Sequence, residues 1–130
     1  MEVFQAKDIL ALAIERASAL NTYWNLFIAV STGIVGVMAS GKSFTASRPL
    51  KGFLSVAFAL FAYSNLDAIL KLGDLRLTLL VMLPADLPTR AALFESLRPA
   101  APWQYIVFHL VFDLVVLATI WIVRWPSGDK

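Results

Sequence analysis

The chain has 130 residues, which is room for one compact domain. Hydrophobic residues make up 59% of it and charged residues only 15%, a balance typical of integral membrane proteins rather than of small soluble domains. The net charge of +2 with scattered cations argues against nucleic-acid binding, and the absence of cysteine excludes disulfides, thiolate metal sites and thiol catalysis. We therefore expect an all-α integral membrane protein, with the lipid bilayer as a binding partner.

Residues 1–19 have apolar side chains at helical spacing, but charged residues interrupt them too often for a membrane span. This pattern predicts an interfacial helix, with a partner-binding helix as the alternative. Glu2 and Asp8 do not suit the basic start of a signal peptide, so the first span is expected to be retained.

The first span is predicted over residues 20–40, with Tyr23 and Trp24 at its entry. One face of this helix carries small and polar residues, which let helix backbones approach closely in lipid. This face is expected to pack against another helix, of the same chain or of a second copy; it consists of Asn25, Ala29, Gly33, Gly36 and Ser40.

A short loop over residues 41–51 contains Lys42, Arg48 and Lys51 and no acidic residue. Lys and Arg are retained on the cytoplasmic side of membranes, so this loop is predicted to be cytoplasmic, near lipid headgroups. Three spans then place the N-terminus outside and the C-terminus inside.

The second span is predicted over residues 52–72, and its second half is polar on one face, with Ser64, Asn65, Asp67 and Lys71. Asp67 and Lys71 have the spacing of an intrahelical ion pair. Residues 73–102 are expected to form a helical extension followed by an interfacial or re-entrant segment, since Pro84 and Pro88 interrupt the apolar run. A fourth short span in this region is the alternative.

The third span, residues 103–125, is the most apolar stretch, and residues 126–130 form a tail. Its 23 residues would reach about 34 Å as a helix, enough to cross a hydrocarbon core of about 30 Å. His109 and Asp113 lie one helical turn apart near its middle, where ionisable groups are costly.

The polar residues of the second and third spans are therefore expected to meet, as a clamp between helices, as the lining of a conducting path, or as a small-ligand site. A single histidine offers neither a metal cage nor a catalytic triad, and GKS at residues 41–43 lacks the rest of a phosphate-binding loop, so no enzyme is predicted. No cofactor is expected, although paired copies of His109 would be an alternative pair of haem ligands.

Two functions follow. The first is a homo-oligomeric ion channel or pore, because three spans cannot enclose a pore alone. Bacterial effector channels and phage holins share this general plan, though no motif here ties the chain to either. The second is a non-conducting anchor or accessory subunit of a larger membrane complex, with residues 3–18 and 85–98 as docking surfaces. Alanine, leucine and arginine usage favours a bacterial inner membrane.

The topology predicts that the loop after the first span and the segment before the third lie on opposite sides of the membrane. Ser43→Cys and Ser96→Cys variants should therefore react with an impermeant thiol reagent from opposite sides of oriented vesicles. Labelling of both from the same side would contradict the three-span topology.

Overall fold

The structure of the protein, a computed structural model, describes residues 5–123. Its regular elements are α1 (Ala6–Ala39), the 3₁₀ helix η1 (Ser43–Ala46), α2 (Arg48–Val81), α3 (Arg90–Leu97) and α4 (Pro102–Ile122), with no strand among the described residues. Three helical stretches, the last of which ends with α4, are long and apolar enough to cross a membrane. The expected all-α fold with three apolar, span-length helices is confirmed.

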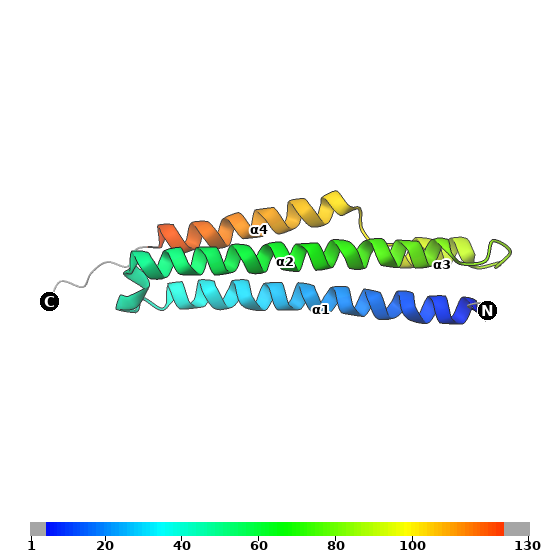
Figure 1. Ribbon diagram of the computed structural model, residues 1–130, viewed down its shortest axis with the longest axis horizontal. Helices are drawn as coiled ribbons and strands as arrows, with labels where there is room; N and C mark the ends of the chain where they lie inside the picture. Colours follow the sequence, from blue (N-terminus) through cyan, green and yellow to red (C-terminus); the bar gives the residue numbers. More distant parts are fainter. Residues whose placement is uncertain (1–4, 124–130) are drawn as a thin grey trace.

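The molecule is a long antiparallel hairpin of α1 and α2, partly covered by two shorter helices (Figure 1). α1 and α2 each have 34 residues and are therefore about 51 Å long. α4 has 21 residues, about 31 Å, so it covers only one half of the hairpin. α3 lies beside the other half (Figure 1).

Each half of the hairpin has a hydrophobic core of its own. The half covered by α4, here called the spanning half, comprises α4 with residues 20–39 and 48–72. Its core is formed by Phe27, Met38, Phe58, Ala62, Val116 and Ile120. The other half, the protruding half, comprises residues 6–19, 73–83 and 90–97. Its core is formed by Ile9, Ala13, Leu80 and Leu83, with Leu93, Phe94 and Leu97 of α3 packed against them.

The structure does not confirm a separate interfacial helix at the N-terminus or a re-entrant segment after the second span. Residues 6–19 are the first turns of α1, because no proline or glycine interrupts the helix before Gly33. Residues 75–81 are the last turns of α2, as the expected helical extension, and the segment after the prolines forms α3. Residues 1–4, Arg124, Trp125 and the 126–130 tail lie outside the described residues.

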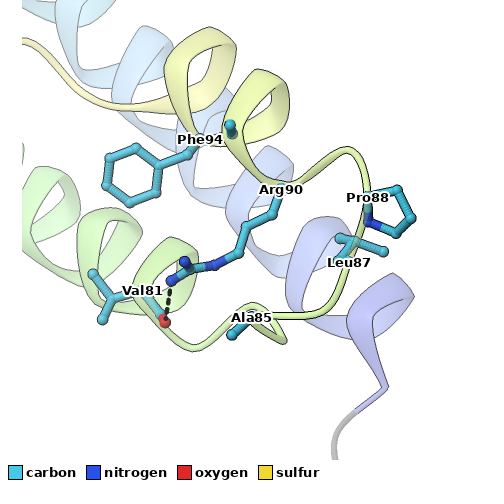
Figure 2. Close-up of a pocket in the computed structure, with 7 residues that line it drawn as sticks. Val81, Ala85, Leu87, Pro88, Arg90 and Phe94 are labelled. Carbon is cyan, nitrogen blue, oxygen red and sulfur yellow. Dashed lines mark hydrogen bonds between the residues drawn. The ribbon is translucent and has the colours of Figure 1, made fainter.

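Arg90 holds the turn that joins α2 to α3. Its Nε donates to the carbonyl of Leu83 at 3.1 Å, and Nη2 donates to the carbonyl of Val81 at 3.5 Å. Figure 2 shows the side chain reaching back from the start of α3 to the end of α2. A cation placed on the free carbonyls of a helix C-terminus also complements the helix dipole. The chain reversal at Pro84–Pro88 is therefore stabilised by Arg90.

Lys51 has a corresponding role at the opposite end of the molecule. It lies in the first turns of α2, so the loop predicted over 41–51 ends earlier, at Ser47. Its side chain is buried, and Nζ donates to the carbonyl of Val123, just beyond α4, at 3.4 Å. The indole N–H of Trp121 donates to the hydroxyl of Ser55 at 3.0 Å. These two bonds join the end of α4 to the start of α2.

The turn after α1 requires a glycine. Gly41 has a φ of 66°, which L-residues with a β-branched side chain adopt only at a cost. Gly41→Val should lower the free energy of unfolding by about 1–2 kcal/mol, whereas Gly41→Asn should cost clearly less because asparagine tolerates this conformation. Titration with denaturing detergent, followed by circular dichroism, measures both. Equal losses for the two variants would contradict a conformational cause.

Candidate functional site

Three helices contribute to a chain of hydrogen bonds inside the spanning half. On α4, His109 Nδ1 lies 3.0 Å from Asp113 Oδ2. On the other side of the ring, Nε2 lies 3.3 Å from Oδ1 of Asn65 on α2. The amide nitrogen of Asn65 in turn donates to the backbone carbonyl of Tyr23 on α1 at 3.0 Å. This polar cluster, Tyr23 carbonyl–Asn65–His109–Asp113, links α1, α2 and α4.

The cluster is enclosed by aromatic side chains. His109 is fully buried, and its ring centroid lies 3.9 Å from that of Phe27 and 5.9 Å from that of Trp24. Phe27 also stacks on Phe58 of α2. These rings exclude water and lipid from the imidazole, so its hydrogen bonds are made in a low-dielectric environment.

The acceptor at one end of the cluster determines where the protons lie. The Tyr23 carbonyl can only accept, so Asn65 presents its amide N–H to it and its oxygen to His109. Nε2 of His109 therefore carries a hydrogen. Nδ1 then shares one proton with the Asp113 carboxyl group, as imidazolium and carboxylate or as imidazole and carboxylic acid. Both arrangements carry no net charge.

A His109–Asp113 pair without net charge suits the position of Asp113, because this residue is near the middle of the apolar helix α4. Its Oδ2 is bound to His109, while Oδ1 is buried and has no hydrogen-bond partner among the described residues. A carboxylate alone at this depth would cost at least about 2.5–3.5 kcal/mol. The pair stabilises the spanning half only as long as both members are present.

Sequence spacing explains the site in part. His109 and Asp113 are four positions apart, which places both on one helix face. Asn65 meets them because α2 and α4 run antiparallel, with Ser55 near Trp121 at one end and Gly73 near Tyr105 at the other. Sequence reasoning placed Asn65 beside this set but missed the Tyr23 carbonyl, for which a sequence carries no signal.

The structure does not bring the remaining predicted polar residues into the cluster. Asp67 and Lys71 form the expected ion pair at 2.6 Å, but Lys71 is exposed and Asp67 is half-buried. Ser64 is exposed on the surface of α2. The predicted polar path is thus divided between a buried cluster and a surface ion pair.

The small-residue face of α1 points away from the rest of the chain. All five of its members are exposed: Asn25, Ala29, Gly33, Gly36 and Ser40. A Cβ atom added at Gly33 or Gly36 would meet nothing within 4 Å. This face is therefore not the contact between α1 and the other helices, which leaves a second copy as the remaining expected partner. Of the basic loop residues, Lys42 and Arg48 are exposed and Lys51 is buried.

The cluster offers little scope for metal or haem binding. Within residues 5–123 no three His, Asp or Glu side chains gather as a metal site. Both ring nitrogens of His109 are engaged by Asp113 and Asn65, so the ring has no free nitrogen for an iron. Compared with known proteins, the chain matches no family model, no curated protein and no solved structure.

The hydrogen bonds predict an asymmetric response to removing the two partners. His109→Leu leaves the Asp113 carboxyl group unpaired and should lower the free energy of unfolding by about 3 kcal/mol. Asp113→Leu leaves a neutral imidazole still bound to Asn65 and should cost about 1–2 kcal/mol. The double variant should be more stable than His109→Leu alone. Detergent-induced unfolding measures all three, and simple addition of the two losses would contradict the pairing.

Proposed function

We propose that the chain is a non-conducting membrane anchor or accessory subunit that presents a helical docking surface outside the bilayer. The observation that carries this proposal is the difference in helix length. α4 is about as long as a hydrocarbon core is thick, whereas α1 and α2 exceed it by about 20 Å. The protruding half is the part of the α1–α2 hairpin that extends beyond the hydrocarbon core.

Charged side chains support this division of the hairpin. Where the two halves meet, Arg16 lies on α1, the Asp67–Lys71 pair lies in the last turns of the spanning half on α2, and Arg98 precedes α4. Tyr105, whose ring favours the headgroup region, lies beside Gly73 of α2 near this level. A membrane boundary at this level leaves residues 6–19, 73–83 and 90–97 outside the hydrocarbon.

The protruding half has the surface of a protein that binds another. Large apolar side chains are exposed there although no lipid would cover them, among them Ile14 at 56%, Val81 at 59% and Met82 at 56% exposure. At its tip, a cavity of about 610 Å³ opens between the end of α2 and the start of α3. Figure 2 shows Arg90 and Phe94 beside Val81 in this cavity. An apolar cavity with one guanidinium suits an apolar side chain next to an acidic group on a partner.

The expected orientation places this docking surface on the outer side of a bacterial inner membrane, opposite the basic loop. The polar cluster then acts as a clamp, since His109 is fully buried among aromatic rings. This role requires no ion flux and no catalysis by the chain itself.

A homo-oligomeric channel is the second candidate, and the exposed small-residue face of α1 favours it. Asn25 lies on this face, within the spanning half, and an amide facing lipid is stabilised by a partner helix. In such an assembly, Ser64, Asp67 and Lys71 on the surface of α2 would line a path between copies.

One experiment separates the two candidates. A photo-crosslinking residue at Met82 should yield a discrete adduct with another protein in cells, whereas the same residue at Val107, exposed on α4, should yield lipid adducts only. The purified chain in liposomes should conduct no better than empty vesicles. Ion flux from the pure chain that changes in Asp67→Asn, without an adduct at Met82, would instead establish the channel.

A further inference from the structure

A second cavity lies where the protruding half meets the start of α4. It has a volume of about 800 Å³ and is enclosed by α2, by α3 and by the segment from Arg98 to Tyr105. It is formed because α4 begins away from the end of α3, and residues 98–101 cross the gap in extended form (Figure 1).

Two kinds of polar group line this cavity. Asp74 of α2 and Glu95 of α3 provide carboxylates. Asp74 forms no side-chain hydrogen bond among the described residues, and Glu95 has only a long contact of 3.7 Å with Arg98. The segment that leads into α4 and its first turn provide donors, namely the guanidinium of Arg98 and the hydroxyl of Tyr105.

Two polar side chains from the start of α4, Tyr105 and Gln104, are held in place by backbone N–H groups. The hydroxyl oxygen of Tyr105 accepts from the backbone N–H of Ala100 at 3.1 Å, so its own hydrogen remains available to a ligand. Gln104 likewise accepts from the N–H of Ala101 at 2.9 Å and keeps its amide hydrogens free. The cavity thus presents both hydrogen-bond donors and two carboxylates to a ligand, with Glu95 next to Arg98.

The remaining lining and the depth of the cavity indicate a lipid. Leu70, Leu77 and Phe94 form an apolar part of the wall. Trp103, 64% exposed in the first turn of α4, marks the headgroup level beside it. A ligand with a polar headgroup and an apolar chain would suit this lining. Its headgroup would lie between the charged side chains, and its chain would lie along the apolar wall.

We propose that this cavity binds a phospholipid whose headgroup carries both a phosphate and a primary ammonium group. The phosphate accepts from Arg98 and Tyr105, and the ammonium donates to Asp74 and Glu95. A lipid with an anionic headgroup would bring its charge towards two carboxylates, and a trimethylammonium headgroup has no hydrogen to donate. The proposal goes beyond the docking role and depends only on the membrane boundary.

The test is native mass spectrometry of the delipidated full chain in detergent, titrated with lipids of identical acyl chains. Phosphatidylethanolamine should bind at least about threefold more tightly than phosphatidylcholine or phosphatidylglycerol, the effect of one or two solvent-accessible charged hydrogen bonds. The Asp74→Asn/Glu95→Gln double variant should lose this preference. Arg98→Gln should weaken all three lipids, and Tyr105→Phe should do so to a smaller extent.

Asp86→Asn is the matched control, because this exposed carboxylate lies in the turn before α3 and outside the cavity. It should keep the preference for phosphatidylethanolamine. Equal or tighter binding of phosphatidylglycerol, or a preference that survives in the double variant, would overturn the proposal. Displacement of the lipid by soluble glycerophosphoethanolamine at similar concentration would also overturn it, in favour of a soluble ligand. None of these outcomes depends on the crosslink at Met82.

Discussion

A polar side chain that enters the hydrocarbon layer must find its hydrogen bonds inside the protein, and this requirement shapes the spanning half. Asn65 of α2 meets this requirement with one bond to each of the other two spanning helices. Its amide N–H donates to the Tyr23 carbonyl of α1, and its oxygen accepts from His109 of α4. The imidazole in turn holds Asp113. Aromatic packing by Phe27 and Trp24 depends on this arrangement, since both rings lie against the imidazole.

The second organising feature is the unequal length of the helices. A hairpin of two 34-residue helices cannot be covered by a 21-residue helix, so α3 is needed to bury the apolar surface that α4 does not reach. Arg90 makes this possible by holding the turn that brings α3 back along the hairpin. The gap between α3 and α4 then becomes the cavity near Arg98. Both the proposed docking surface and the proposed lipid site follow from this mismatch.

The sequence predicts where the helices lie along the chain better than it predicts which face of each helix packs against the others. Pro102 marks the start of α4, and the spacing of His109 and Asp113 predicts their contact, because these signals are local. The orientation of α1 is harder, since lipid-facing and core-facing sides are equally apolar in a membrane and periodicity gives little contrast. Gly33 and Gly36 thus suggested packing, but within the chain Phe27 and Met38 provide it. Lys51 appeared to be a surface cation because its partner, the Val123 carbonyl, is distant in sequence.

The position of His109 on the same helix as Asp113 bears on how the chain is assembled in the cell. α4 is the last of the three long helices to be synthesised, and it carries a carboxyl group into the bilayer. Since its partner lies one turn away, the helix forms a neutral pair by itself and does not wait for α2 to lower the cost of insertion. Asn65 instead depends on the register between two helices, because its oxygen lies 3.3 Å from the imidazole only when α4 is at this depth beside α2. The two nitrogens of one ring thus have different contacts: Nδ1 pairs with Asp113 within α4, and Nε2 joins α4 to α2.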